Sequence, residues 1–335
     1  MPFIEDVLTY KSLSIVGLEK NTGKTETLNY ILGRLKNMDK RVALTSIGID
    51  GESRDIVTDT QKPEIRIYQG MIFISTEKHY LQRRITSEIL EVSNIHTSLG
   101  RLVVAKAINS DKVLLSGPAD TQNLKTLIAS MAKYNIDLTM VDGALSRLSL
   151  ASPAVTEGMI LTTGAAYSAN IPVLVRKTKY IYDLINLPVV EPELKQKLDL
   201  VDSGIIAIDS ENNLHDLGVQ SVFMLKKVKD KIFTYGNRIF VAGATSNYLF
   251  EFLRMQKNIA SIELIVKDFS RIFASPDVYY SFLKKGGKVR VVTKTKLAAV
   301  CINPISPQGY NLSSDELKIS MQKTLQIPVY DVKKL

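Results

Sequence analysis

The segment GLEKNTGKT, residues 17–25, combines the residue types that bind a phosphate group. Two glycines bound a short loop, and Lys24 and Thr25 follow at the start of an apolar pattern with helical spacing. Unpaired N–H groups in the first turn of a helix, together with the positive end of its dipole, attract an anion. Lys24 would reach the terminal phosphates of a nucleotide, and the Thr25 hydroxyl would be a ligand of Mg²⁺. The residues that we expect to contact the nucleotide, ATP, are Glu19, Lys20, Asn21, Thr22, Gly23, Lys24, Thr25 and Glu26.

The sequence on either side of this loop predicts the elements that position it. Residues 13–16 form a short apolar run that is typical of a buried strand, and Gly17 ends it. Apolar residues recur at helical spacing over residues 26–38, which follow the loop. A strand, a glycine-bounded loop and a helix, in this order, are the context that a phosphate-binding loop requires.

The spacing of the glycines departs from the common phosphate-loop pattern, GxxxxGK[ST]. That pattern requires a glycine or another small residue at position 18, whereas this chain has Leu18 and a glycine one residue earlier. The resulting spacing, G-x5-G-K-T, resembles the dethiobiotin synthetase and cobyrinic acid amidase branch of P-loop proteins, which are relatives of the deviant-Walker ATPases. Lys20 lies inside the loop, one place later than the deviant-Walker signature lysine, so we do not assign it that lysine's role.

An acidic residue ends a further predicted strand. Residues 136–141 are mostly apolar and are followed by Asp142 and a glycine. Parallel α/β sheets bind their ligands at the carboxyl ends of the strands. Asp142 therefore matches a Walker-B-type acid, which together with Thr25 would hold Mg²⁺ directly or through water.

Two more acids follow the predicted second strand, residues 41–47. Asp50 and Glu52 lie just beyond its carboxyl end, in the sequence IDGES. There they would orient the attacking water or contact the metal, as catalytic residues beside Lys24. The alternative is a capped turn with no part in catalysis.

Strands and helices alternate along the rest of the chain, which predicts an α/β protein with a mainly parallel, P-loop NTPase-type sheet and helices on both faces. We expect a nucleotide-binding domain over residues 1–185 and a second α/β domain over 200–335. The acidic, proline-containing stretch NLPVVEPELKQKLD would join them. Residues 77–92 predict a helix, and the strands predicted over 100–108 and 111–118 predict a hairpin.

Composition excludes several classes of protein. The chain has 335 residues, of which 45% are hydrophobic and 23% charged, as is ordinary for a globular protein. Its net charge of +9 is spread along the sequence, with a modest concentration of lysine over residues 284–296, so a nucleic-acid partner is not expected. A single cysteine, no signal-peptide pattern and no apolar run near the roughly 20 residues of a membrane span predict a cytoplasmic protein with no membrane partner.

Several segments together resemble the P-loop reactivase subunit that accompanies cobalamin-dependent lysine 5,6-aminomutase. They are GLEKNTGKTETLNYIL, TSIGIDGE, VDGALSRLSLASPAVTEGMILTTGAAYSA and the terminal IPVYDV. The likeness covers most of residues 10–180 and is thinner over 200–335, where NPISPQG and the last strand carry it. The residues that match its loop motif are Asn21, Gly23, Lys24 and Thr25, and its metal or water ligands would be Asp50, Glu52 and Asp142.

This resemblance implies a function, the ATP-driven restoration of a mutase whose cobalamin has been inactivated. The partner would be the cobalamin-dependent aminomutase, alone or together with a second ATPase subunit. A nucleotide cycle can bias the required conformational change, because the states of the protein differ in affinity. The lysine-rich residues 284–296 would contact an acidic surface of the mutase, and Asn303 lies where many P-loop relatives recognise the base.

Two other functions fit the same loop. A synthetase like dethiobiotin synthetase would act on a small carboxylic or amino acid, and it would consume ATP only when that acid is present. A nucleotide-binding module that does not hydrolyse ATP would keep the fold but would lack the nucleotide cycle. Leu18 is the residue that favours the module, since a large side chain at this position would narrow the phosphate site.

Overall fold

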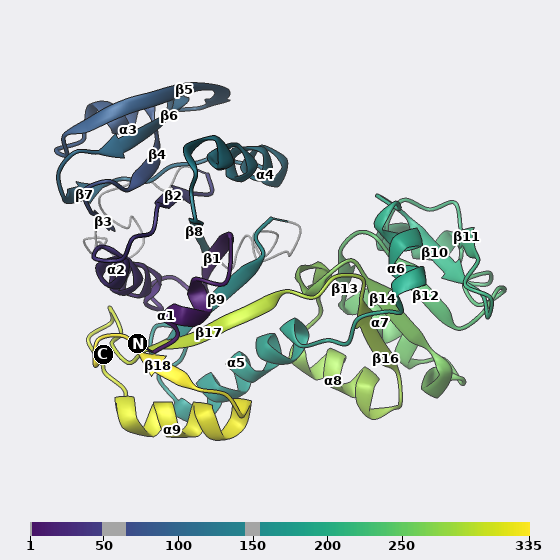
Figure 1. Cartoon of the computed structure of the whole chain (residues 1–335). Helices are drawn as coiled ribbons and strands as arrows, with labels where there is room; N and C mark the ends of the chain where they lie inside the picture. Colours follow the sequence, from purple (N-terminus) through teal and green to yellow (C-terminus); the bar gives the residue numbers. More distant parts are fainter. Residues whose placement is uncertain (1, 49–64, 145–154) are drawn as a thin grey trace. The chain divides into compact units, whose positions relative to one another are not determined.

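The computed structural model describes residues 2–48, 65–144 and 155–335 of an α/β protein (Figure 1). The chain forms two compact units, which we call unit 1, Met1–Lys179 with Lys296–Leu335, and unit 2, Tyr180–Thr295. Within the described residues, no helix is both long enough and apolar enough to cross a bilayer.

Unit 1 is built on a nine-stranded sheet with the strand order β18-β17-β9-β1-β8-β2-β4-β6-β5. In chain order, the bounds of these strands are β1 Ser12–Gly17, β2 Val42–Ser46, β4 Ile72–Thr76, β5 Ser87–Thr97, β6 Gly100–Ala107, β8 Leu138–Ala144, β9 Gly158–Gly164, β17 Lys296–Asn303 and β18 Val329–Asp331. All neighbouring strands from β18 to β4 run parallel, whereas β6 and β5 are antiparallel to their neighbours. The predicted α/β class and mainly parallel sheet are therefore confirmed.

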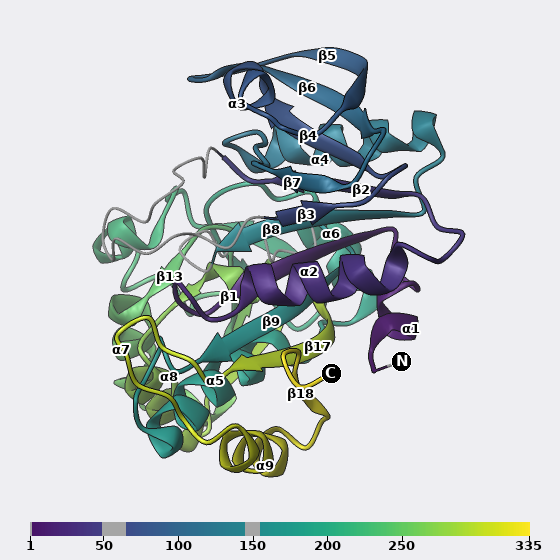
Figure 2. The same cartoon turned by 90° about the vertical axis from the view of Figure 1, so that its left-hand side faces the viewer.

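Helices cover both faces of this sheet, which is why its central strands are apolar on both sides. On one face, α1, Ile4–Val7, and α2, Lys24–Leu35, pack in the cluster that contains Leu13. Figure 2 shows α2 lying along the sheet in front of β1 and β8. On the opposite face, α4, Thr121–Ser130, packs in the cluster that contains Val141. Each fully buried leucine or valine contributes about 1.5–3 kcal/mol to this packing.

The remaining elements of unit 1 are short or lie at its edges. They are α3 Glu77–Leu81, a 3-10 helix over Met131–Tyr134, α9 Ser314–Leu325, and the two-stranded pair of β3 Ile65–Ile67 with β7 Asp111–Val113. Helix α5, Ile171–Ile185, begins in unit 1. The start of α9 agrees with its sequence signal, because Ser313 Oγ accepts the N–H of Glu316 at 3.3 Å.

Residues 77–107 differ from their predicted structure. Of the helix predicted over residues 77–92, only Glu77–Leu81 is helical, and residues 87–92 belong instead to the edge strand β5, Ser87–Thr97. The predicted hairpin is also wrong, because β6 pairs with β5 and β4, whereas β7 pairs with β3. The apolar spacing in ILEV fits a helix or a strand, and pairing with Val103 and Ala105 on β6 decides between them.

Unit 2 is a smaller α/β body with the strand order β11-β10-β12-β14-β16. Strands β12, β14 and β16 are parallel and are connected through α7 and α8, while β10 is antiparallel to both of its neighbours. The elements of unit 2 are α6 Pro192–Asp199, β10 Ile205–Ile208, β11 Leu214–Asp216, β12 Arg238–Val241, β13 Thr245–Ser246, α7 Asn247–Arg254, β14 Glu263–Val266, β15 Ile272–Phe273, α8 Pro276–Lys284 and β16 Lys288–Val291, with 3-10 helices over Val222–Lys227, Ile259–Ser261 and Phe269–Arg271.

The boundaries of the units differ from the predicted division into residues 1–185 and 200–335. The change from unit 1 to unit 2 falls inside α5, and residues 296–335 return to unit 1. Strand β17 pairs in parallel with β9 and with β18, and so extends the sheet of unit 1. The sequence over 288–303 has a nearly continuous strand pattern, and such a pattern does not indicate which sheet a strand joins.

Candidate functional site

The loop after β1 lies at a reversal in the strand order of unit 1. From β1 the chain continues to β2, on the β8 side of the sheet, whereas from β9 it later returns to β17, on the other side. In open α/β sheets, ligands bind outside the carboxyl ends of the strands at such a topological switch point. Residues 18–23 follow the carboxyl end of β1, so they occupy the position at which this fold binds ligands.

Two residues of the loop have a left-handed backbone. Asn21 has a φ of 60° and Gly23 a φ of 95°, a region that glycine adopts freely and asparagine tolerates. A Cβ at Gly23 would also lie 2.9 Å from the Cβ of Asn303. Helix α2 starts at Lys24, and its N-cap residue is Gly23, which has no side chain to cap the helix. The N–H groups of its first turn therefore remain available to a ligand.

Hydrogen bonds hold the loop against the strands on the far side of the switch point. The N–H of Leu18 donates to the carbonyl oxygen of Thr162 at 2.9 Å, and Thr22 Oγ1 lies 3.3 Å from Thr162 Oγ1. Asn303 Nδ2 donates to the carbonyl oxygen of Asn21 at 3.0 Å. Thr162 belongs to β9, and Asn303 ends β17. A loop that is fixed in this way loses less conformational entropy when a ligand binds.

The unusual glycine spacing has a steric cause. A Cβ at Gly17 would lie 2.5 Å from Thr22 Oγ1 and 2.9 Å from Lys24 Cγ, so these side chains require a glycine there. Leu18, in contrast, is only 2% exposed. A side chain that projected into an open binding site would be exposed, so Leu18 packs in the interior and does not narrow the loop. Residue 17 is therefore the position of this loop at which neighbouring side chains leave no room for a Cβ, and the chain has a glycine there.

Asp142 lies on β8, the strand that adjoins β1. It is in register with Ile15 of β1 on one side and with Ser46 of β2 on the other, near the carboxyl ends of all three strands. Asp142 is half-buried. The structure thus places this acid beside the strand that leads into the loop. Asp50 and Glu52 fall within 49–64, outside the described residues.

The other expected contact residues divide between the loop and the helix. The first three residues of α2 are half-buried, and the third, Glu26, forms an ion pair with Lys333 at 3.4 Å. Glu19 and Lys20 are exposed, and Glu19 Oε1 accepts the N–H of Lys20 at 2.9 Å. The carboxylate of Glu26 is therefore paired away from the loop, whereas the two exposed residues remain on its outer side.

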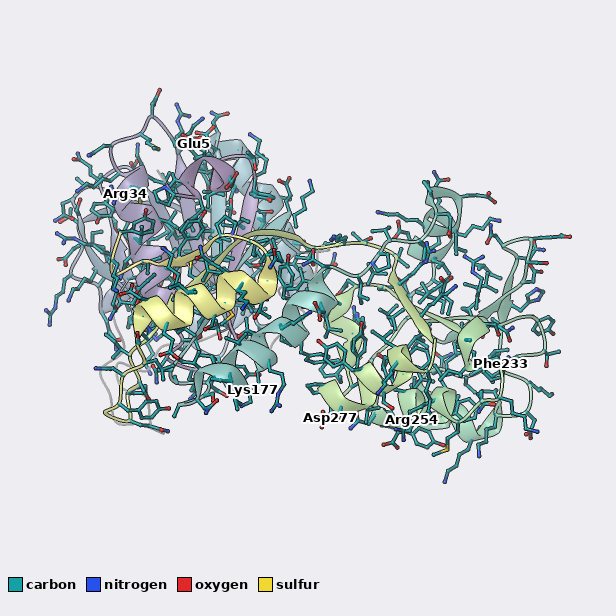
Figure 3. All side chains as sticks on the ribbon, turned by 90° about the horizontal axis from the view of Figure 1, so that it is seen from below. Glu5, Arg34, Lys177, Phe233, Arg254 and Asp277 are labelled. Carbon is teal, nitrogen blue, oxygen red and sulfur yellow. The ribbon has the colours of Figure 1, made fainter. Side chains whose placement is uncertain are left out.

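The structure also assembles residues that the motif did not indicate. Lys177 lies on α5 (Figure 3). It donates from Nζ to the carbonyl oxygen of Tyr167 at 3.3 Å, and its ammonium lies 4.5 Å from the centre of that ring. Burial, and then the negative charge of Glu19, raises the pKa of Tyr167. Lys177 thus places a cation beside Tyr167, which follows the carboxyl end of β9. Its distance from the loop in sequence left no spacing signal for it.

The residues that end β9 have a bracing role. Thr163 Oγ1 lies 2.9 Å from Thr178 Oγ1 on α5. A Cβ at Gly164 would lie 2.1 Å from the carbonyl oxygen of Asn303, and the N–H of Ala165 donates to that same oxygen at 2.8 Å. These contacts fix the carboxyl ends of β9 and β17 close together. Gly164 is thus required by backbone packing.

The described residues offer few groups for metal binding or for thiol chemistry. Over residues 2–48, 65–144 and 155–335, no group of three His, Cys, Asp or Glu residues could hold a metal ion by itself. The single cysteine, Cys301, is 1% exposed, and burial raises its pKa to about 12. A protonated thiol is a poor nucleophile, so this buried cysteine is not a candidate nucleophile.

Comparison with protein-family models, with curated proteins and with solved structures finds no match to this chain. Two features of the site therefore carry its interpretation. One is the uncapped start of α2 behind two left-handed residues. The other is the set of hydrogen bonds that fixes this loop to β9 and β17.

Proposed function

We propose that the loop between β1 and α2 binds ATP together with Mg²⁺, and that the protein hydrolyses this ATP. The observation that carries the proposal is the uncapped start of α2 behind two left-handed residues. Such a helix start attracts phosphate through its free N–H groups and its dipole. The side chain of Lys24 passes over Gly17, which supports the proposal because it adds a positive charge beside this helix start.

The residues around the loop would have distinct roles in hydrolysis. Water attacks the γ-phosphorus, and the bond to the bridging oxygen breaks, so that ADP and inorganic phosphate form. In phosphoryl transfer the protein supplies mainly positioning and charge. Lys24 would neutralise the terminal phosphates, and the N–H groups of the loop would hold them. Asn303 and Thr162 would keep the loop in its binding conformation.

Thr25 and Asp142 fit the demands of Mg²⁺. This ion prefers oxygen ligands, and it usually takes only one or two from the protein and the rest from phosphate and water. The absence of a three-ligand cluster among the described residues is compatible with this mode. When bound, Mg²⁺ neutralises charge on the β- and γ-phosphates. The Thr25 hydroxyl would reach it from the helix start, and the Asp142 carboxylate from β8.

We infer further that this ATP cycle serves to reactivate a cobalamin-dependent lysine 5,6-aminomutase by promoting release of its inactivated cofactor. The sequence resemblance over residues 10–180 supports this client. Unit 2 supports it as well, because its strands and helices surround no comparable loop among the described residues. A body without its own nucleotide site is suited to contact a partner, and a second ATPase subunit would be a further partner.

The decisive assay uses the mutase itself. Purified lysine 5,6-aminomutase is inactivated by turnover and then mixed with this protein, ATP, Mg²⁺ and fresh adenosylcobalamin. Activity should return with the wild-type protein and should not return with Lys24→Ala or with a non-hydrolysable ATP analogue. No recovery, even when a partner ATPase is supplied, would contradict the reactivase function. Whether the loop binds ATP would then be decided by calorimetry alone.

A synthetase remains a second candidate because of one observation, the cation of Lys177 beside Tyr167 on the β9 side of the loop. A small carboxylate bound to Lys177 would lie near the phosphates. ATP turnover would then rise strongly when the correct acid is present without any mutase. A screen of amino, diamino and carboxylic acids tests this, and the stimulation should disappear in Lys177→Ala. Stimulation that persists in this variant would rule out Lys177 as the acid-binding residue.

A further inference from the structure

The segment that precedes β12 in unit 2 winds with a period of three residues. Val222–Lys227 is a 3-10 helix, and the N–H groups of Val228 and Lys231 continue this winding by donating three residues back, at 3.0 Å and 2.9 Å. Side chains three residues apart lie above one another in such a winding. One row packs into unit 2, because Leu225 and Val228 are buried, so the other two rows face outward.

The outward rows carry lysines and an exposed aromatic ring. We call residues 222–231 the ridge. Phe223, Lys226 and Lys229 share one of its rows, and Lys227 and Asp230 share the next. Phe223 is 84% exposed. The ridge contains four lysines and one aspartate, all of them exposed, and its net charge is therefore +3.

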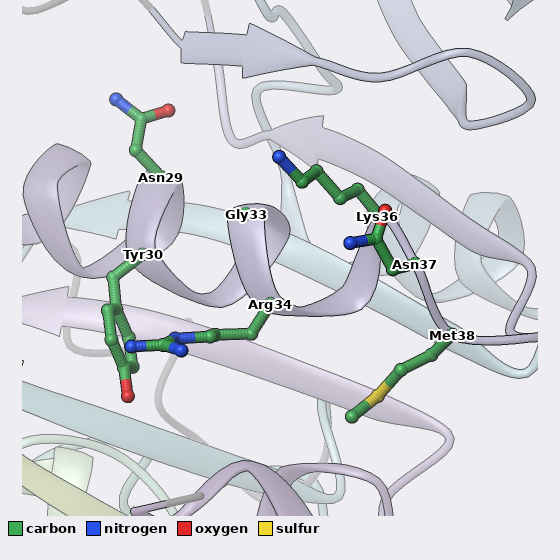
Figure 4. A pocket seen from close by; sticks show the side chains of 7 residues that line it. All are labelled: Asn29, Tyr30, Gly33, Arg34, Lys36, Asn37 and Met38. Carbon is green, nitrogen blue, oxygen red and sulfur yellow. The ribbon is translucent and has the colours of Figure 1, made fainter.

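The described residues do not neutralise the lysines of the ridge. Within the part of the chain that the structure describes, no ion pair joins a carboxylate to any of these lysines. Arg290, also in unit 2, instead pairs with Glu263 at 2.8 Å. In unit 1, Figure 4 shows a hollow of about 520 Å³ over α2, where Arg34 lies against the ring of Tyr30 and donates to the carbonyl oxygen of Leu335 at 2.8 Å. The ridge differs from both places, because its positive charge is open to a partner.

Exposed apolar side chains accompany this charge. The ring of Phe233, two residues after the ridge, stacks on Phe252 of α7, with ring centres 6.4 Å apart. Met255, which follows Phe252 by three residues, is 73% exposed. Full burial of a phenylalanine or methionine side chain contributes about 1.5–3 kcal/mol, which Phe223 and Met255 do not gain in the folded unit. Apolar side chains beside a charged rim are typical of a protein–protein interface.

The ridge is a better candidate for partner contact than residues 284–296, to which the sequence assigned this role. In that stretch, Lys285 Nζ donates to the carbonyl oxygen of Arg254 at 3.5 Å, and Arg290 pairs with Glu191 at 3.1 Å as well as with Glu263. Part of its positive charge is therefore engaged within unit 2. The ridge instead concentrates its four lysines within residues 226–231.

We propose that the ridge is the docking surface for an acidic, partly apolar surface of a partner protein. Carboxylates of the partner would pair with the lysine rows, and its apolar part would cover Phe223. Such charge complementarity steers association and fixes the orientation of the two proteins. The inference rests on the proposed function for the identity of this partner, the aminomutase.

Nucleic acid fits the ridge less well than an acidic protein. Asp230 lies between Lys229 and Lys231 in the sequence, and its carboxylate would repel a phosphate backbone. The ridge also has no arginine, whose planar fork binds a phosphate at two points. A protein surface, in contrast, can offer a cation to Asp230 beside its own carboxylates.

Charge reversal tests the ridge, with lysine 5,6-aminomutase immobilised as the probe and this protein titrated over it with ATP and Mg²⁺. Lys226→Glu combined with Lys229→Glu should weaken binding of the mutase at least ~20-fold. Lys284→Glu combined with Lys288→Glu is the matched control, because it changes the charge of unit 2 by the same amount, and it should stay within ~3-fold of wild type. Calorimetry should show unchanged ATP affinity in both double variants.

An uncharged variant separates the apolar contact from the charges. Phe223→Ser keeps every charge, and it replaces an exposed side chain, so the melting temperature should not change while binding of the mutase weakens at least ~5-fold. Unchanged binding in Phe223→Ser would overturn the proposal, and so would equal losses in the two double variants. In either case wild type would still bind the mutase, so the proposed client would stand.

Two further outcomes distinguish the partner. Wild-type protein that binds ATP but does not bind the mutase would refute the client, and with it the ridge as the docking surface. A single-stranded DNA 20-mer that binds wild type but not the Lys226→Glu and Lys229→Glu double variant, while binding of the mutase is unchanged, would assign the ridge to nucleic acid. That result would equally overturn the proposal.

Discussion

Both units contain a parallel strand, a short connection and a helix, but only unit 1 leaves the backbone of this connection open. In unit 1, residues 18–23 lead from β1 into α2 and include left-handed Asn21 and Gly23. In unit 2, residues 242–246 lead from β12 into α7, and none of them has a positive φ. Left-handed residues turn successive N–H groups toward a common point, which is how a loop binds an anion.

The two connections also differ in how their polar groups are used. In unit 2, Thr245 and Ser246 pair with β15, and Thr245 Oγ1 donates to the carbonyl oxygen of Arg271 at 3.0 Å. The connection in unit 1 is held instead at Leu18 and Thr22 and by the side chain of Asn303, with no strand paired to it. The same order of elements therefore gives a closed turn in one unit and an open loop in the other.

Matched glycine variants, one in each unit, should give the largest change in ATP affinity. Gly23→Val forces a β-branched residue to a φ of 95° and against Asn303, so ATP binding should weaken at least ~100-fold, or about 2.8 kcal/mol. The matched variant in unit 2 is Gly243→Val, where a Cβ would meet no atom within 4 Å and no left-handed backbone is required. Its ATP affinity should stay within ~2-fold of wild type. Calorimetric titration of both variants checks this, and equal losses would contradict the difference between the loops.

The stability of unit 2 at alkaline pH should depend on its buried tyrosines. Burial raises the pKa of Tyr180 and of Tyr279 above the ordinary value of 10.0, and these residues are 7% and 1% exposed. Above pH 10 the unfolded tyrosines lose their protons while the folded ones keep them. The free energy of unfolding should therefore fall as pH rises, by up to ~1.4 kcal/mol per pH unit for each tyrosine.

Urea unfolding between pH 9 and 11 measures this slope. Tyr279→Phe removes one of the tyrosines whose pKa is raised by burial, so its slope above pH 10 should be shallower than that of wild type, while the slopes below pH 10 agree. A wild-type stability that stays constant or rises above pH 10 would show that these tyrosines do not titrate as their burial requires.

A pair of asparagine variants, one in each unit, should give the smallest change in ATP affinity, and the two variants should differ in which property they change. Asn303→Ala removes the hydrogen bond to Asn21 in the loop, so ATP should bind ~5-fold more weakly, in keeping with about 1 kcal/mol for one hydrogen bond. Asn247→Ala in unit 2 removes a bond of 2.7 Å from the N–H of Ser275. It should lower the free energy of unfolding by a similar amount without changing ATP affinity. Loss of affinity in Asn247→Ala would contradict the assignment of the site to unit 1.

The elements around the loop were predictable because their signals are local. The apolar run before Gly17 and the helical spacing after the loop agree with β1 and α2. The position of Asp142 beside β1 also follows the usual pairing of parallel strands. Asn303 was expected at the base of the nucleotide, but its hydrogen bond to Asn21 was not indicated, because the pairing of β17 with β9 brings it to the loop. The contact of Lys177 with Tyr167 had no sequence signal either.

Other parts of the fold depend on contacts that the sequence does not show. Residues 87–92 have a spacing that fits a helix, and they are part of strand β5 because β6 pairs with them. Residues 296–303 carry a strand pattern that fits either unit, and their pairing with β9 places them in unit 1. Leu18 suggested a narrowed loop, yet burial of its side chain leaves the loop open. In each case a distant contact decided between local alternatives.

Calorimetric titration of Mg²⁺–ATP into wild-type protein and into Lys24→Ala tests the central claim most directly. Lys284→Ala is the matched control, because this exposed lysine belongs to unit 2 and should change the affinity by no more than ~3-fold. We expect binding by wild type, at least ~100-fold weaker binding by Lys24→Ala and equal melting temperatures, since removing a charge at the phosphates costs several kcal/mol without disturbing the core. Unchanged ATP affinity in Lys24→Ala would contradict the assignment of the β1–α2 loop as the nucleotide site.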